Sequence, residues 1–151
     1  MSNSDKVNLI QKLRDVSGAG VMECKRALEE AHGDYEAALK IIHERGLAKV
    51  EKRSDRETGA GLVVSYVHNE RIGVLLEVRA ETDFVVRSEP FKEMAHELVM
   101  QIAAAAPETT EELLQQPYIK DESKKVEELI KDVIARVGEN VQVSKFFRIA
   151  V

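Results

Sequence analysis

The chain has 151 residues, of which 44% are apolar and 32% charged, with eight glycines and three prolines. This length suits one ordinary core, or one core with a small appended module, and the composition is globular rather than disordered. The formal net charge of -5 argues against a general nucleic-acid binder, which presents clustered Lys and Arg to phosphates.

Sequence features also indicate the compartment. The single cysteine, Cys24, excludes an internal disulfide and leaves no second thiol for a redox pair. The N-terminal MSNSDKVNLI lacks the apolar core of a signal peptide, and no apolar run approaches the roughly 20 residues that cross a membrane. We therefore expect a soluble cytoplasmic protein with no membrane partner.

Helical spacing predicts a first helix in SDKVNLIQKLRDVSG, which ends at Ser17-Gly18. Its expected apolar positions are Val7, Leu9, Ile10, Leu13 and Val16. A second helix is predicted in GVMECKRALEEAHG, with Gly33 as its C-terminal stop. Its apolar stripe consists of Cys24, Ala27, Leu28 and Ala31.

The third helix is predicted in DYEAALKIIHERG, with Asp34 as N-cap and Gly46 as stop. Its stripe is Ala38, Ile41 and Ile42, so the three short helices form a small bundle. The polar stretch AKVEKRSDRETGAG that follows is typical of a linker. We place the boundary near Ser54, giving domains at residues 1–53 and 54–151.

From Gly61 the apolar period changes to two, which predicts a β-hairpin turning at HNER. The alternating positions are Leu62, Val64 and Tyr66, then Ile72, Val74, Leu76 and Val78. Leu75 breaks the alternation, so we expect the second strand to be partly covered on both faces.

A long helix is predicted from Ser88, Glu89 and Pro90, with a capping hydroxyl at its start and Pro107 at its end. TTEELLQQ predicts a short helix, DESKKVEELIKDVIARVG a longer one, and NVQVSKFFRIAV a third strand. The predicted fold is α+β: a three-helix bundle followed by a small antiparallel three-stranded sheet packed with helices.

No catalytic, metal or cofactor motif is evident. The four histidines lie on separate elements without metal-ligand spacing, and Cys24 on an apolar stripe is best explained as a small buried hydrophobe. The glycine cluster SGAGV has no preceding strand and is explained as a turn between helices. A further hypothesis, that the protein is an enzyme such as a small hydrolase, would require His68 or His96 beside a carboxylate in a cleft.

Two features leave alternatives open. Met22 lies about 160° around its helix from Cys24, so it is either an exposed contact residue or loose core filling. Phe84 follows Asp83 at a strand-to-helix junction, where an apolar side chain beside a charge suits a binding anchor. Its parity with Val78 and Ala80 equally allows a core position.

Three segments resemble the bacterial translation elongation factor Ts family. LRDVSGAGVMECKRALEEAHGDYEAA is similar to the family's N-terminal module, and LLEVRAETDFVVRSEPF to its Thr-Asp-Phe-Val signature. VEELIKDVIARVGENVQVSKFFRIAV is similar to its Gly-Glu-Asn segment and following strand. Together they cover most of the chain in the family's order.

The resemblance implies a guanine-nucleotide exchange factor, not an enzyme, for the GTPase elongation factor Tu. It implies that Asp83 and Phe84, flanked by Thr82 and Val85, push into the GTPase beside its nucleotide and Mg²⁺ site. It further implies that the GTPase is contacted by the remaining positions that match the family's contact residues: Arg14, Val21, Met22, Val137 and Gly138. Neither cofactor nor direct nucleic-acid partner is implied.

Many family members carry a second core subdomain, a coiled-coil insertion and a C-terminal module. This chain runs from its helices directly to the closing strand. Compact members pair through the sheet, so the resemblance, together with an exposed sheet edge and the Phe146-Phe147 pair, predicts a homodimer. The alternative is a non-catalytic interaction module, because the first fifty residues also resemble a ubiquitin-associated-like bundle that acts as a tether.

Overall fold

The computed structural model describes all 151 residues and divides into two compact units, residues 1–52 and 53–151. Each unit has its own core and is described by itself. None of the helices combines the length and apolar character needed to span a bilayer. The structure is a mixture of helices and antiparallel sheet, which confirms the predicted α+β class.

The N-terminal unit consists of α1 (Asn3–Ser17), α2 (Val21–Glu30) and most of α3 (Tyr35–Arg53). Ser2 and Asp5 form a capping box at the start of α1, and Gly18 ends it in the left-handed conformation, with φ 69°. Asp34 caps α3 as predicted, because its Oδ1 accepts the Ala37 N–H at 2.9 Å. The buried side chains are Leu13, Cys24, Ala27, Leu28, Ala38 and Ile42.

Two predictions for this unit are wrong. Val7 and Val16 are exposed. A three-residue spacing rotates each side chain by about 60° from the one before, so the first and last of four such positions lie off the buried face of the helix. Gly46 does not stop α3, which continues to Arg53. Gly46 is itself buried within the helix, so much of the expected linker is helical.

The C-terminal unit contains a three-stranded antiparallel sheet in the order β1-β2-β5. Its strands are β1 (Ala60–His68), β2 (Ile72–Ala80) and β5 (Val141–Ala150). Residues 69–71 connect the two strands, and the turn closes where the Arg71 N–H donates to the His68 carbonyl at 3.0 Å. Asn69 and Glu70, the central residues of this turn, have positive φ, 49° and 59°, as a type I′ turn requires. The predicted hairpin and third strand are confirmed.

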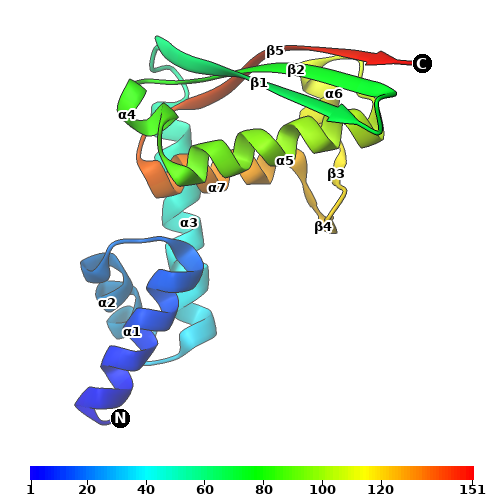
Figure 1. Cartoon of the computed structure of the whole chain (residues 1–151). Helices are drawn as coiled ribbons and strands as arrows, with labels where there is room; N and C mark the ends of the chain where they lie inside the picture. Colours follow the sequence, from blue (N-terminus) through cyan, green and yellow to red (C-terminus); the bar gives the residue numbers. More distant parts are fainter. The chain divides into compact units, whose positions relative to one another are not determined.

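Helices cover one face of this sheet (Figure 1). They are α5 (Glu89–Ala105) and α7 (Val126–Val137), together with the short α4 (Asp83–Val86) and α6 (Thr110–Gln115). The inward residues Val74, Leu76 and Val78 meet the apolar stripe of α5 beneath them. Burial of each such side chain contributes about 1.5 to 3 kcal/mol, which holds the helices to the sheet.

Two local predictions in this unit are wrong. Ser88 is the N-cap residue of α5 and Pro90 lies in its first turn, as predicted, but the Ser88 hydroxyl makes no capping bond, because it donates to the Val85 carbonyl at 2.6 Å. The helix expected from Asp121 starts at Val126. The intervening Asp121–Lys125 forms β4, which pairs with β3 (Pro117–Tyr118) in a small two-stranded sheet.

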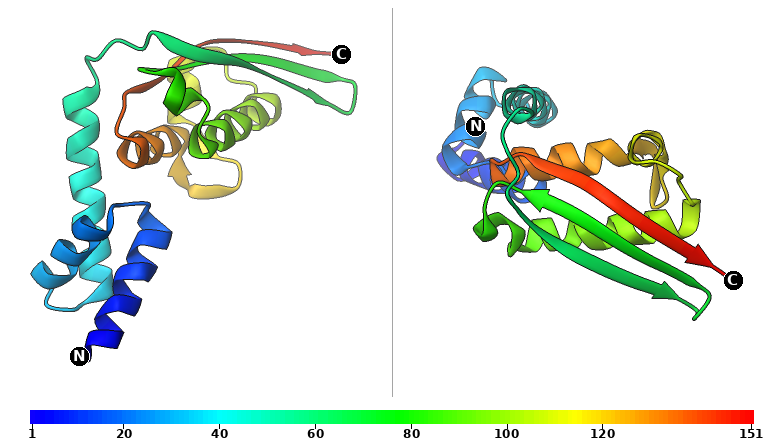
Figure 2. Two further views of the ribbon diagram at one scale, coloured as in Figure 1. Left: turned by 60° about the vertical axis from the view of Figure 1, so that its left-hand side comes forward. Right: turned by 90° about the horizontal axis from the view of Figure 1, so that it is seen from above.

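The second face of the three-stranded sheet is uncovered (Figure 2). The outward residues of β2 are half-buried except Leu75, which is 50% exposed, so the expected partial cover of both faces is lacking at Leu75. Other large apolar side chains exposed on these strands are Val63, Val67, Phe147 and Ile149. An apolar sheet face without a helix layer is unusual for a chain on its own.

Candidate functional site

The most exposed aromatic side chain of the protein stands on α4, directly after β2. Phe84 is 86% exposed, so it is not part of the core, and Asp83 beside it is also exposed. Val85 and Val86, the next two residues, are buried. Because successive helical residues point about 100° apart, one turn sends two side chains outward and two inward. We call residues 82–85 the tip.

The tip is held from within. Val85 and Val86 pack into the C-terminal unit, where α4 contacts β1, β2 and α5. Thr82 is the N-cap of α4, and its hydroxyl accepts the Val85 N–H at 3.4 Å. At the other end, the Ser88 hydroxyl donates to the Val85 carbonyl. Phe84 is thus an exposed ring on a helical turn that is anchored to the C-terminal unit.

Glu139, just after α7, binds the start of the tip. Its Oε1 accepts the Thr82 backbone N–H at 2.9 Å, and its Oε2 accepts the Thr82 hydroxyl at 2.7 Å. Gly138 makes this approach possible by ending α7 in the left-handed conformation, with φ 77°. These bonds bring Val137 and Gly138 to the same end of the unit as the tip.

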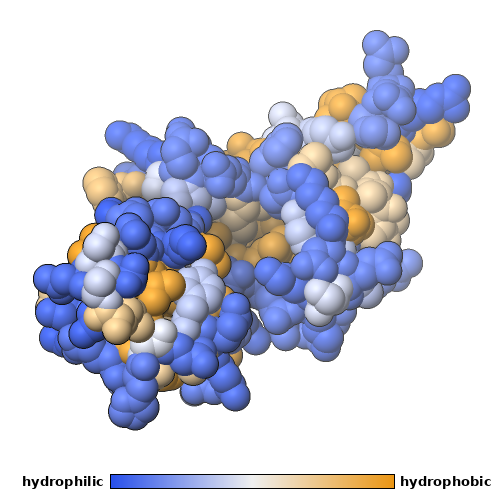
Figure 3. Space-filling model, turned by 90° about the horizontal axis from the view of Figure 1, so that it is seen from below, coloured by the Kyte–Doolittle hydropathy of each residue, from blue (hydrophilic) through white to orange (hydrophobic).

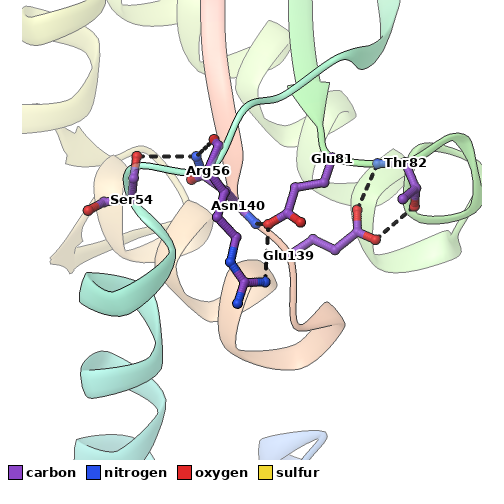
Figure 4. Close-up of polar contacts among 6 residues, drawn as sticks. All are labelled: Ser54, Arg56, Glu81, Thr82, Glu139 and Asn140. Carbon is purple, nitrogen blue, oxygen red and sulfur yellow. Dashed lines mark hydrogen bonds and ion pairs between the residues drawn. The ribbon is translucent and has the colours of Figure 1, made fainter.

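The neighbouring residues repeat the contact in the opposite direction (Figure 4). The Asn140 backbone N–H donates to Glu81 Oε1 at 2.8 Å. The Asn140 side-chain amide donates to the carbonyls of Arg56 and Ser54, at 2.8 and 3.3 Å. Arg56 also lies 3.7 Å from Glu81 Oε1 as an ion pair. The segment after α7 is therefore fixed to the end of β2.

The predicted residues of the N-terminal unit lie around the turn between α1 and α2. Arg14 is in the last turn of α1, and Val21 and Met22 begin α2. Met22 is 58% exposed, which excludes core filling, and Val21 is also exposed. Ser17 stabilises this turn, because its hydroxyl accepts the Ala19 N–H at 3.2 Å and donates to the Leu13 carbonyl at 2.6 Å. Figure 3 shows hydrophobic residues exposed among hydrophilic ones on this unit.

Other chemistry-bearing side chains have structural partners. His68 Nδ1 lies 2.9 Å from the Tyr66 hydroxyl, and the His96 ring meets Tyr66 edge to face. Cys24 is buried, and burial raises the pKa of its thiol, which favours the unreactive protonated form. No three His, Cys, Asp or Glu side chains are placed to hold a metal ion.

Sequence reasoning missed the residues that fix the tip. Neither the helical turn at 83–86 nor the roles of Glu81, Glu139 and Asn140 were expected. The Thr82–Glu139 contact joins positions 57 residues apart, and such a contact has no local periodic signal. The one available signal was the Gly-Glu-Asn sequence itself, in which a glycine that suits a helix end precedes two polar residues.

Comparisons with known proteins agree on one family. The family model described as "Elongation factor TS" matches residues 81–151. A relative named elongation factor Ts from Thermosipho melanesiensis is 39% identical over 189 residues, covering 95% of this chain and 96% of the relative. The elongation factor Ts of Thermotoga maritima is 40% identical over 186 residues, covering 94% of each chain.

Together, the α+β fold and these relatives define the class as a translation elongation factor. The chain belongs to the elongation factor Ts family, as its resemblance predicted. The stretch aligned with the Thermosipho relative is longer than this chain of 151 residues, so that relative contains segments with no counterpart here.

Proposed function

We propose that this protein is a guanine-nucleotide exchange factor for the GTPase elongation factor Tu. It releases GDP by inserting Asp83 and Phe84 beside the nucleotide and Mg²⁺ site, with Thr82, Val137 and Gly138 in contact around them. Val85, expected among these contacts, is buried and anchors the turn from beneath instead. The observation that carries this proposal is an aromatic ring 86% exposed on an anchored helical turn. Exposing a Phe side chain to water is unfavourable, and burial in a partner's pocket recovers that free energy.

The energetic basis is coupling between two ligands. A factor that binds the nucleotide-free GTPase more tightly than the GDP-bound form must weaken GDP binding by the same ratio. Displacing the groups that hold phosphate and Mg²⁺ supplies the difference in affinity. No covalent bond changes, so the protein acts as an exchange factor and not as an enzyme.

The N-terminal unit supplies a second contact. Arg14, Val21 and Met22 dock on the GTPase, and the exposure of Val21 and Met22 supports this role. Methionine suits such a surface because its flexible thioether side chain adapts to the partner. Docking here raises the local concentration of the tip at the nucleotide site.

The uncovered face of the sheet supports a homodimer of this chain. Val63, Val67, Leu75, Phe147 and Ile149 form an apolar face that a second copy would cover by sheet-on-sheet packing. Compact family members pair through the sheet, and their assembly with the GTPase contains two copies of the factor and two of the GTPase. The protein operates in the cytoplasm, where translation takes place.

The test is release of fluorescently labelled GDP from bacterial elongation factor Tu, with and without this protein. We expect the release rate to rise with the concentration of the protein and then to saturate. Binding to the GTPase without faster release would support the alternative, a tether that uses the N-terminal bundle. If the protein neither binds the GTPase nor accelerates GDP release, the proposed exchange function is wrong.

A further inference from the structure

At the base of the tip, two neighbouring segments are joined by two hydrogen bonds, each from a backbone N–H of one segment to a carboxylate of the other. Glu139 accepts the Thr82 backbone N–H, and Glu81 accepts the Asn140 backbone N–H, at 2.9 and 2.8 Å. Each segment thus caps a backbone amide of the other with a charged acceptor. Hydrogen bonds to charged groups are the stronger ones, and two that run in opposite directions fix both position and orientation.

Glu139 has a second role that Glu81 lacks. Its Oε2 accepts the Thr82 hydroxyl proton at 2.7 Å, so that hydroxyl cannot donate elsewhere and its lone pairs are free to face the Val85 N–H. Thr82 is the N-cap of α4, the single turn that carries Phe84. A turn of only four residues is not stable by itself, so its direction depends on its cap and on burial.

We infer that Glu139 is a positioning residue for nucleotide exchange, which acts through Thr82 to set the direction of α4 and of the Phe84 ring. This inference rests on the proposed function and assigns a role to a residue outside the GTPase contacts named above. Glu139 itself need not touch the GTPase. The tip is presented preorganised, so less free energy is lost in ordering it when it enters the nucleotide site of the docked GTPase.

A positioning role differs from a docking role in the kinetic quantity that it changes. Docking by the N-terminal unit does not involve Glu139, so the concentration of protein that gives half-maximal release should change by less than about twofold in Glu139→Ala. The maximal rate of GDP release should fall by about fivefold to tenfold, as expected for loss of hydrogen bonds to a charged group near the surface.

Thr82 provides the second arm of the experiment. Thr82→Val keeps the shape but removes the hydroxyl, whereas Thr82→Ser keeps the hydroxyl. We expect Thr82→Val to reduce the maximal rate and Thr82→Ser to restore most of it. Because Glu139 and Thr82 act as one unit, the double variant Glu139→Ala/Thr82→Val should lose much less than the product of the two single losses.

The matched control is Glu128→Ala, at the opposite end of α7. Glu128 also accepts a backbone N–H, that of Lys125, at 2.7 Å, but it lies about 17 Å away along the helix. Its removal should leave the maximal rate unchanged. Melting curves of all free variants identify any loss of folding. If Glu139→Ala does not fold, the comparison of Thr82→Val with Thr82→Ser tests the positioning role.

The outcomes separate this inference from the proposed function. A normal maximal rate in Glu139→Ala, or losses that multiply in the double variant, would overturn the positioning role. Phe84→Ala, assayed in parallel, reports on the exchange mechanism itself. If Phe84→Ala is impaired and Glu139→Ala is not, only the positioning role is wrong. If Phe84→Ala exchanges normally, the insertion of Asp83 and Phe84 proposed above is wrong.

Discussion

Leu75 of β2 lies directly opposite Phe147 of β5, and both side chains are at least half exposed on the uncovered face of the sheet. Ser65 of β1 is the partner of Leu75 on its other side, so one row crosses all three strands. In the next row, Val67 and Ile149 flank Gly73. The apolar side chains thus form a continuous surface rather than isolated exposures, as an interface requires.

We predict that the chain is a homodimer at micromolar concentration and that Leu75→Glu makes it a monomer. The substitution would bury a charge against the apolar face of the second copy, which is strongly unfavourable. Sedimentation equilibrium should give about twice the monomer mass of 16.9 kDa for the unmodified protein. Ile119→Glu, at an exposed apolar position outside the sheet, should remain dimeric. A monomer in both the free protein and the complex would contradict this prediction.

We predict that Met22→Asp weakens complex formation with elongation factor Tu without unfolding the N-terminal unit. The exposed thioether would be replaced by a charge that keeps its water, and an acidic residue in the first turn of α2 does not destabilise the helix. Binding is measured by titration calorimetry and stability by thermal melting. Val7→Asp, at a similarly exposed position in α1, is the control. A large fall in melting temperature would show that Met22 supports the fold instead.

A substitution far from the tip should affect stability alone. Gln101 is fully buried, its amide nitrogen donates to Gln116 and the Pro117 carbonyl, and its oxygen accepts the Ile119 N–H at 2.9 Å. Gln101→Leu leaves these groups unpaired, so we expect a loss of about 1 to 3 kcal/mol in the free energy of unfolding. Urea unfolding measures this loss, with the exposed Gln142→Leu as control. GDP release below the melting range should be unchanged.

Elements whose signals are local could be predicted from the sequence. The period of two in β1 and β2 gave the hairpin, since Leu62 and Val64 face the same buried layer as their partners Val78 and Leu76. The spacing of apolar residues also predicted the buried face of a helix where intervals of three and four residues alternate. It failed for Val7 and Val16, which follow a strict three-residue repeat.

Features set by distant residues could not be predicted. Gly46 is a strong stop signal by itself, yet it is buried within α3 and the residues beyond it continue the helix. The strand at Asp121–Lys125 depends on pairing with Pro117–Tyr118 and not on its own charged sequence. The tip could be located from its Thr-Asp-Phe-Val residues, but the carboxylate that orients it is on another segment.

The last prediction concerns the exposed ring of the tip. If Phe84 enters a pocket on the GTPase, Phe84→Ala removes both the contact and the displacement that it drives. A buried aromatic anchor is typically worth about 2 to 4 kcal/mol, so stimulated GDP release should fall by roughly 30-fold or more. The measurement is the rate of labelled GDP release at a saturating concentration of the variant.

The free variant should keep its stability, because the ring is 86% exposed and contributes little to the core. Val85→Ala is the matched comparison one residue further along α4, where the side chain is buried. Truncating that buried side chain leaves a small cavity, so its melting temperature should fall, whereas that of Phe84→Ala should not. Normal exchange by Phe84→Ala together with a strongly lowered melting temperature would mean that the ring supports the fold, and the exchange mechanism proposed for the tip would be wrong.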